Sequence, residues 1–283
     1  MISLILATKG HKKDDIKRFL NSIKSTNQSL FEVIIVCQDE KEYLDEILIN
    51  FRLDIKIFYS SPGLSKARNV GIRHAKGDIL AFPDDDCVYT KNLIKNIESF
   101  FQFNSQIDII SFNVFDLSNS YQLSFVKIKE TRELLMKDIA TGVSSISLFH
   151  RNKNKIYFDE EFGVGAKYNS SEEFDYVLRL MLTGSKLLFS NKFRVLHPDS
   201  SGTKAKGIYK RTSLNGIGHG AYYRKNYQYL RFNYVFEHLV SRPFIGFLYY
   251  SISLKKRKAK CSLILLQARL RGFFLYKTAN KYD

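Results

Sequence analysis

The sequence has few cysteines and no long apolar run, and each absence excludes a class of protein. The three cysteines, Cys37, Cys87 and Cys261, are odd in number and widely spaced, which excludes a disulfide framework and a zinc site of the CxxC type. We therefore expect a reducing compartment. No run approaches the roughly 18 apolar residues of a membrane span, and residues 1–7 lack the basic stretch that opens a signal peptide. Neither a transmembrane segment nor a signal peptide is expected.

Two glycine-rich motifs that bind phosphates are also absent. GxGxxG does not follow the first expected strand and GxxxxGK[ST] occurs nowhere, so the usual dinucleotide fold and the P-loop are not supported. With 283 residues, 45% of them hydrophobic, the chain can still bury one sizeable core and carry an appendage. A bound nucleotide would have to be held in another way.

The net charge of +16 is distributed unevenly along the chain. Residues 199–283 contain 17 Lys and Arg against 3 Asp and Glu, a net +14, which leaves +2 for residues 1–198. A nearly neutral body with a cationic, aromatic tail suggests that the tail meets a polyanion. The candidates are a lipid surface and a nucleic acid.

Apolar strands alternate with segments of helical period, which is typical of βαβ units and a parallel sheet. Ligands of doubly wound sheets bind beyond the carboxyl ends of the strands. Thr8, Gln38 and the acids at 84–86 all follow strand ends, so we expect them to share one crevice. Strands are expected at 2–7, 31–37, 53–59, 79–82, 107–115, 144–149, 187–190 and 193–196, and helices at 12–25, 40–50, 64–75 and from 172.

Three consecutive acids, Asp84, Asp85 and Asp86, directly follow the apolar run at 79–82. Carboxylates at the end of a buried strand raise the free energy of the folded state unless a cation lies beside them. A divalent cation such as Mg²⁺ or Mn²⁺, held by one or two carboxylates and by the phosphates of a substrate, fits this pattern. The alternative is a solvated turn that caps the next helix, with Asp86 or Thr90 as the N-cap.

A second acidic group, Glu172, Glu173 and Asp175, begins a helix after a glycine-rich loop. The structural interpretation is that these carboxylates stabilise the helix N-terminus, with Glu173 in a capping box. The functional interpretation is that one of them is a general base that faces the metal crevice. His197, at the end of a later strand, is either a structural histidine or a third metal ligand.

Taken in order, these motifs resemble the family 2 glycosyltransferases of the GT-A fold, nucleotide-sugar enzymes that build polysaccharides. The resemblance covers about residues 1–198, and 158–179 look close to one bacterial branch that makes surface glycans. The four motifs are Thr8 after the first strand, the segment 63–72 (GLSKARNVGI) before the fourth, Asp84-Asp85-Asp86 as the DxD motif, and Glu172-Glu173-x-Asp175.

The resemblance implies a role for each of these residues. Asp84 would meet the ribose or sugar, Asp86 would bind the metal, and His197 would complete the metal site as it does in some members. Glu173 falls at the position of the family's base, which is often Asp, so Glu172 and Asp175 stay open as alternatives. The remaining donor-binding residues would be Thr8, Gln38, Arg68, Asn69 and Asp85. Gln38 stands where the family commonly has an acid that reads uracil, which leaves UDP and dTDP open.

The predicted fold class is α/β, a GT-A type doubly wound mixed sheet over 1–198 with a basic, aromatic, helical extension over 199–283. The predicted activity is inverting transfer of a sugar from a UDP- or dTDP-sugar to a hydroxyl of a glycan or lipid-linked acceptor in surface polysaccharide synthesis. The expected cofactor is Mg²⁺ or Mn²⁺. The competing function is nucleic-acid binding through the tail. Two observations argue against it: the positive charge is confined to the tail, and no helix-turn-helix, zinc or RRM motif is present.

The tail predicts a place for the protein in the cell. Apolar runs at 243–254 and 261–276 flank a basic cluster at 255–260, a combination that binds anionic lipid. We expect a cytoplasmic protein that is peripheral to the inner face of the cell membrane. The alternative is that the tail helices pack on the rest of the chain and the lysines form a solvated face.

Overall fold

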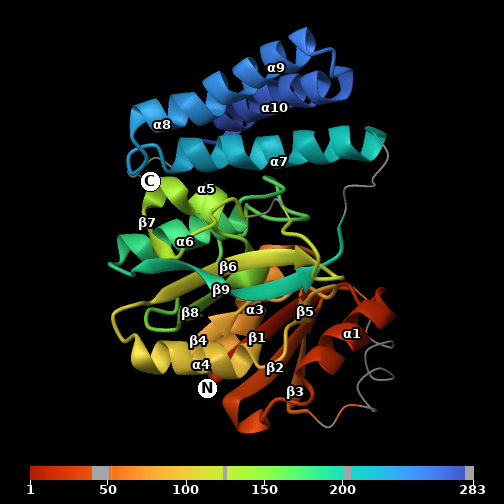
Figure 1. Cartoon of the computed structure of the whole chain (residues 1–283), viewed down its shortest axis with the longest axis vertical. Helices are drawn as coiled ribbons and strands as arrows, with labels where there is room; N and C mark the ends of the chain where they lie inside the picture. Colours follow the sequence, from red (N-terminus) through yellow and green to blue (C-terminus); the bar gives the residue numbers. More distant parts are fainter. Residues whose placement is uncertain (40–50, 52, 124–125, 200–204, 278–283) are drawn as a thin grey trace. The chain divides into compact units, whose positions relative to one another are not determined.

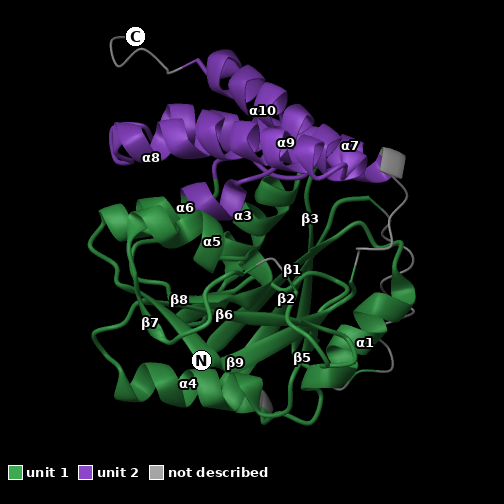
Figure 2. Ribbon diagram, turned by 45° about the horizontal axis from the view of Figure 1, so that its top comes forward, with its two compact units in different colours: residues 1–158, 176–199 green, residues 159–175, 200–283 purple. Residues whose placement is uncertain are grey.

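The structure is a computed structural model that describes residues 1–39, 51, 53–123, 126–199 and 205–277. The helix expected at 40–50 lies outside the described residues. The chain forms two compact units, which Figure 2 shows in green and purple. The first comprises Met1–Phe158 and Tyr176–Asp199, and the second Asp159–Asp175 and Ser200–Asp283. The predicted domain boundary after residue 198 stays a prediction.

The first unit is built on a mixed sheet in the order β3-β2-β1-β4-β8-β6-β9-β5, with β7 paired to β9 (Figure 1). Neighbours β3, β2, β1 and β4 run parallel, as do β6 and β9, whereas β8, β5 and β7 pair antiparallel. The strands are β1 (Ile2–Thr8), β2 (Phe31–Cys37), β3 (Ile55–Tyr59), β4 (Ile79–Ala81), β5 (Val88–Tyr89), β6 (Ile109–Asp116), β7 (Arg132–Leu134), β8 (Leu148–Arg151) and β9 (Leu187–His197).

Burial explains why these segments become strands and helices. Strand β2 is buried along its whole length, as expected for a parallel strand covered on both faces. Helix α1 buries Ile16, Phe19, Leu20 and Ile23, the i, i+3, i+4, i+7 stripe of an amphipathic helix. The helices of this unit are α1 (Lys13–Ile23), α3 (Leu64–His74), α4 (Leu93–Phe103), α5 (Ile139–Gly142) and most of α6 (Glu172–Leu182).

Two strand predictions are wrong in detail. Ser145–Ser147 forms a 3₁₀ helix, so β8 begins only at Leu148. Residues 187–197 form one strand rather than two, because a bulge accommodates Asn191 and Lys192, the residues between the two expected strands. The register passes from Phe112 opposite Ser190 to Asn113 opposite Arg194, which loops residues 191–193 out of the ladder with β6.

The second unit is helical. Small residues let α7 and α10 approach closely, because a Cβ on Gly220 would meet the backbone of Arg269 and one on Gly272 would meet the carbonyl of Ile217. Within the described part of the chain, no helix is both long and apolar enough to cross a bilayer. Beside the start of α6, the helices of this unit are α7 (Ala205–Lys225), α8 (Phe232–Phe236), a π-helical turn (Glu237–Ser241), α9 (Arg242–Ile252) and α10 (Lys256–Leu275).

We expect Gly272→Ala to destabilise the second unit by about 1–3 kcal/mol, the usual cost of overpacking a tight contact. The control is Gly246→Ala on α9, whose new Cβ would lie 3.1 Å from the flexible Ser262 side chain. Alanine is favoured over glycine inside a helix by about 0.5–1 kcal/mol, so the control should be neutral or stabilised. Denaturant unfolding followed by circular dichroism measures both, and equal stability of the two variants would contradict the packing described.

Candidate metal centre

The three consecutive acids lie in a turn between two strands. Strand β4 runs into buried Phe82, and the amide of Cys87 donates to the carbonyl of Asp84 (3.2 Å). The chain then enters β5, which pairs antiparallel with the end of β9, with Val88 opposite Leu196. This pairing brings the end of β9 against the acidic turn.

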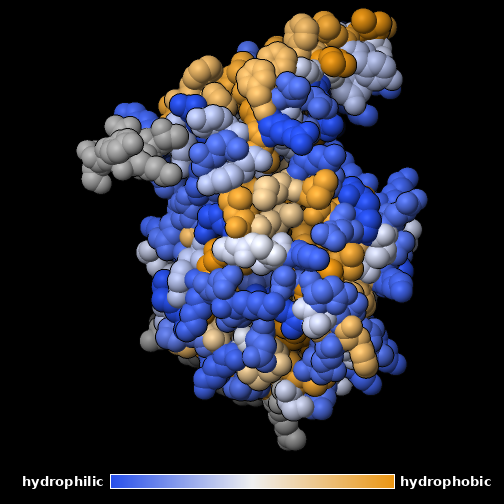
Figure 3. Space-filling view, turned by 90° about the vertical axis from the view of Figure 1, so that its left-hand side faces the viewer, coloured by the Kyte–Doolittle hydropathy of each residue, from blue (hydrophilic) through white to orange (hydrophobic). Residues whose placement is uncertain are grey.

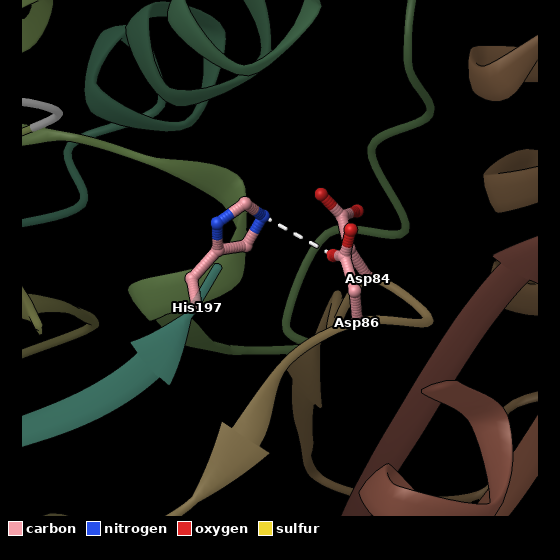
Figure 4. A group of neighbouring side chains, drawn as sticks. All are labelled: Asp84, Asp86 and His197. Atoms are coloured by element: carbon pink, nitrogen blue, oxygen red, sulfur yellow. Dashed lines mark ion pairs between the residues drawn. The ribbon is translucent and has the colours of Figure 1, made fainter. Parts of the chain in front are cut away.

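The turn and β9 together form a group of possible metal ligands, drawn in Figure 4. Nε2 of His197 lies 3.1 Å from Oδ1 of Asp86. Asp84, Asp86 and His197 each offer one ligand atom, and these atoms lie within 4.8 Å of one another. Figure 4 shows the two carboxylates side by side with the imidazole directed toward them. Two carboxylates and an imidazole are a donor set that suits Mn²⁺, and the carboxylates suit Mg²⁺.

Asp86 is the most strongly stabilised anion of the turn. Burial alone would raise its pKa, but hydrogen bonds from His197 and Lys12 outweigh that effect and hold the pKa well below its usual value. Nζ of Lys12 lies 2.8 Å from Oδ2 of Asp86 and 3.3 Å from Oδ1 of Asp85. Burial likewise opposes the charged form of His197, yet its contact with Asp86 raises the pKa of the imidazole.

The other two acids are less well compensated. Burial raises the pKa of Asp84, with Arg68 opposing and Asp86 adding to the rise. Burial also raises the pKa of Asp85, against the opposing effects of Lys12 and Thr8. Three carboxylates thus crowd one turn and favour a further positive charge. The residues fit a divalent cation.

The alternative interpretation of the turn as a helix cap is wrong. The residue at the N-cap of α4 is Asn92, and its side chain makes no capping hydrogen bond. Thr90 instead donates its hydroxyl hydrogen to the carbonyl of Arg194 (3.1 Å), and Asp86 is engaged with His197 and Lys12. The acids therefore do not serve to start the next helix.

The ends of β1 and β2 contribute polar groups to the same edge of the sheet. Oγ1 of Thr8 donates to Oδ2 of Asp85 (3.0 Å) and accepts from the amide of Gly10 (3.0 Å). The amide of Gln38 donates to the carbonyl of Thr8, and its side-chain oxygen accepts from the amide of Gly63 (2.9 Å). The structure thus brings Thr8 to the acidic turn and fastens Gln38 to the start of α3.

Helix α3 carries Arg68 and Asn69, which are both buried. Nη2 of Arg68 lies 3.4 Å from Oδ1 of Asp84 and donates to the hydroxyl of Ser145 (3.0 Å). The guanidinium also lies over the ring of Phe158 at 5.3 Å. The amide of Asn69 accepts from the backbone N–H of Phe158 (2.7 Å) and donates to its carbonyl (3.0 Å). Asn69 therefore fixes the chain at Phe158, while Arg68 reaches the acidic turn.

Lys12 and Ser145 are the contacts that sequence reasoning missed. Lys12 precedes α1 in a polar segment, where nothing distinguishes it from a solvated lysine. Its one signal is its position just beyond the end of β1, the edge at which the other polar residues gather. Ser145 fell inside a segment interpreted as a strand.

The acids at the start of α6 belong to the second unit and differ in burial. Asp175 is fully buried, and its Oδ1 lies 2.7 Å from Nζ of Lys225 and accepts from Nδ2 of Asn226 (3.2 Å). Glu172 is buried, whereas Glu173 is partly exposed. Burial and a lysine partner thus distinguish Asp175 from the partly exposed Glu173.

The comparisons with known proteins identify the family. Residues 3–158 match the model of the family described as glycosyl transferase family 2. The chain belongs to this family. A relative described as an uncharacterised glycosyltransferase of Haemophilus influenzae is 25% identical over 189 residues, which are 64% of this chain and 62% of the relative. The chain thus spans about three fifths of the length of that relative.

Solved structures show the same fold as this glycosyltransferase family member. S. aureus TarS 1-349 in complex with UDP-GlcNAc matches with a TM-score of 0.57 and 16% identity, over 96% of this chain and 92% of that one. The mannosyltransferase PcManGT from Pyrobaculum calidifontis, in complex with GDP-Man and Mn²⁺, matches with a TM-score of 0.65 and 12% identity, over 96% and 87%. The predicted α/β fold of GT-A type, with a helical C-terminal region, is confirmed.

We expect Asp86→Asn to weaken Mn²⁺ binding by at least the roughly tenfold loss typical of altered metal surroundings, because the variant loses a charged ligand. The amount of bound Mn²⁺ can be measured by electron paramagnetic resonance, with and without UDP or dTDP. Asp78→Asn is the matched control, since its carboxylate is 85% exposed and pairs only with the chain's amino terminus among the described residues. Unchanged Mn²⁺ affinity in Asp86→Asn would exclude Asp86 as a ligand.

Proposed function

We propose that the protein is a metal-dependent, inverting glycosyltransferase that moves a sugar from a nucleotide-diphosphate sugar to an acceptor hydroxyl. The observation that carries this proposal is the group formed by Asp84, Asp86 and His197 beyond the end of β4, in a chain of this family. The ligands of two similar structures, UDP-GlcNAc in TarS and GDP-Man with Mn²⁺ in PcManGT, support a nucleotide-sugar donor.

The proposed role of the metal site is to stabilise the leaving group of the transfer reaction. Asp86 and His197 would hold Mg²⁺ or Mn²⁺, and when bound the cation neutralises the charge that develops on the departing diphosphate. Asp84 would lie nearer the ribose or sugar. Arg68, which is buried against Asp84, would keep that carboxylate oriented and charged.

The polar residues at the sheet edge would bind the nucleotide. Thr8 holds Asp85 by a hydrogen bond of 3.0 Å, so both would present a fixed surface to the donor. The side-chain oxygen of Gln38 already accepts a hydrogen bond from the amide of Gly63, which precedes α3. The amide hydrogens of the Gln38 side chain can pair with a pyrimidine face. Asn69 would act by fixing the chain at Phe158. UDP and dTDP are the donors proposed.

Glu173 is the base proposed for the acceptor. Its carboxylate would take the proton of the acceptor hydroxyl as that oxygen attacks the anomeric carbon, so the configuration inverts in a single displacement. The burial of Glu172 and the ion pair of Asp175 with Lys225 favour Glu173 among the three acids. Asp175 would then position the start of the helix.

We expect Glu173→Gln to lower kcat by at least about 10²-fold, the low end for general-base catalysis, with little change in donor affinity. A screen of UDP- and dTDP-sugars with Mn²⁺, read by release of UDP or dTDP, first identifies the donor. Glu161→Gln is the control in the same unit, an exposed acid that pairs with Lys167 (3.2 Å), and it should keep full turnover.

Two outcomes would contradict this assignment. Normal turnover of Glu173→Gln, with loss of kcat at unchanged stability in Asp175→Asn, would move the base to Asp175. Absence of release from every donor in the screen would contradict the proposed function. Asp175→Asn is otherwise expected to lower the free energy of unfolding, because it removes the buried ion pair with Lys225 and leaves that lysine paired with Asp159 alone of the two carboxylates.

We further propose a lipid-linked or glycan acceptor in surface polysaccharide synthesis, and a peripheral position on the cytoplasmic face of an anionic membrane. The second unit supports this location, since residues 199–283 carry a net +14. Its helix α9 also exposes an apolar face, formed by Ile245, Leu248, Tyr249 and Ile252 at i, i+3, i+4 and i+7. An apolar face beside basic residues is what an interfacial helix requires.

Replacing this apolar face should weaken membrane binding. Ile245→Ser with Ile252→Ser is expected to reduce flotation with anionic vesicles, because each change removes an apolar contact with the acyl region. Turnover of a soluble donor and acceptor should be unchanged. The control replaces exposed Phe103 of α4, in the first unit, by Ser. Equal flotation of the double variant and the wild type would contradict docking through α9.

A further inference from the structure

The second unit contains an open pocket that the proposed transfer reaction does not use. Its volume is about 590 Å³. It lies where α9 turns into α10, with one wall from α7. The lining residues are Ile208, Tyr250, Lys255, Lys256, Arg257, Lys258, Cys261 and Ser262.

The pocket has a concentrated positive charge. Lys255 to Lys258 are four consecutive basic residues at the N-terminus of α10, whose first turn contains no acid. The N-cap residue, Lys255, makes no side-chain capping hydrogen bond. Within the described ranges, Lys255, Lys256 and Lys258 make no ion pair with a carboxylate. The positive end of a helix dipole repels nearby cations. The basic cluster at the start of α10 is therefore unfavourable unless an anion binds there.

A phosphate is the anion that this geometry suits. Helix N-termini bind phosphate through backbone amides and the dipole, and Lys and Arg add charge-assisted hydrogen bonds. Nζ of Lys258 lies over the ring of Tyr250 at 5.6 Å, which holds one ammonium at the pocket wall. A terminal phosphate, which has three non-ester oxygens and more charge than a phosphodiester with two, can contact several of these groups together.

Two exposed aliphatic residues lie in the turn that leads into the basic residues of the pocket. Ile252 and Leu254 are 83% and 82% exposed, and they lie three residues and one residue before Lys255. Leu254 adopts a left-handed conformation with φ 54°, which is uncommon for a residue with a side chain. The turn thus presents apolar groups next to cations, and Figure 3 shows apolar side chains gathered over the C-terminal helices with hydrophilic ones beside them.

We propose that this pocket binds the terminal phosphate of an anionic lipid headgroup while Ile252 and Leu254 enter the bilayer. The proposal rests on the peripheral membrane location proposed above and deepens it by naming the group recognised. The exposed aliphatic pair favours a lipid over a soluble phosphate or a nucleic acid, since neither needs an apolar surface. A second copy of this unit would bring two cationic pockets together, which charge repulsion opposes.

Cys261 offers a direct probe of the pocket. It lines the pocket and is partly exposed, whereas Cys37 and Cys87 are buried. Alkylation of the native full chain by N-ethylmaleimide, located by mass spectrometry, therefore reports mainly on Cys261. Vesicles of phosphatidylcholine with phosphatidic acid should slow this alkylation. Vesicles with phosphatidylglycerol, matched in surface charge, should slow it less, because their headgroup has no terminal phosphate.

Paired variants separate the pocket from the general charge of the tail. Lys256→Gln with Lys258→Gln should weaken binding to phosphatidic acid vesicles roughly 30-fold, from about fivefold for each basic residue at a lipid surface. The control is Arg271→Gln with Lys277→Gln, which removes the same charge from exposed residues outside the pocket. Flotation of the control should change less than about threefold, and turnover of a soluble donor should be unchanged in both.

Each of the other outcomes would overturn one part of the proposal. Equal binding to the two charge-matched vesicles, or equal losses in the two paired variants, would overturn the pocket and leave membrane binding intact. Protection of Cys261 by glycerol 3-phosphate, without protection by phosphatidic acid vesicles, would assign the pocket to a soluble phosphate and overturn the lipid. Failure of the wild type to float with either vesicle would overturn the membrane location as well, without bearing on the transfer reaction.

Discussion

The pairing of the two-residue strand β5 with the end of β9 is the contact on which the metal centre depends. Only Val88 and Tyr89 form it, yet it joins two segments more than a hundred residues apart in sequence. Tyr89 makes the contact stable, because its buried ring packs edge-on against Phe19 at 5.4 Å. Successive side chains of a strand point to opposite faces, so a slip of one residue would turn His197 away from Asp86.

The charges of the turn are balanced in a way that leaves it open to a cation. Lys12 is half-exposed and sits on a flexible stem, and ion pairs of exposed lysines contribute little free energy. Arg68, in contrast, is buried and held by Ser145. Arg68 is therefore buried and Lys12 half-exposed, and a divalent cation at Asp86 would replace the Lys12 ammonium beside a carboxylate that also contacts His197. Burial is the main cause of the raised pKa values of Asp84 and Asp85, and the neighbouring Asp86 carboxylate adds to both.

The sequence predicted what depends on local patterns. Apolar runs located the parallel strands, and the four ordered motifs identified the family. Long-range geometry was not accessible in the same way: the bulge that makes β9 continuous depends on its pairing with β6, and the role of Lys12 depends on where β1 ends relative to the acidic turn.

The acids at the start of α6 also depend on long-range contacts that the sequence could not predict. Glu172, Glu173 and Asp175 are chemically alike and lie within one helical turn, so spacing alone could not separate them. The separation comes from Lys225, fifty residues later in the chain, which pairs with Asp175 and also with Asp159 at 2.6 Å. A buried carboxylate without such a partner would be strongly destabilising. The ion pair and the full burial of Asp175 therefore distinguish it from Glu173, the partly exposed acid of the three.

The packing of α7 against α10 explains why the second unit keeps large apolar side chains at its surface. Glycines at 216, 220 and 272 bring the two backbones into direct contact, so this interface requires few large side chains. The large residues of α9 and of the turn after it are then not needed for folding and stay at the surface. Single exposed apolar residues are ordinary, but a continuous apolar helical face beside four consecutive basic residues is not. Folding alone does not account for that combination, whereas binding to an anionic, apolar surface accounts for both halves of it.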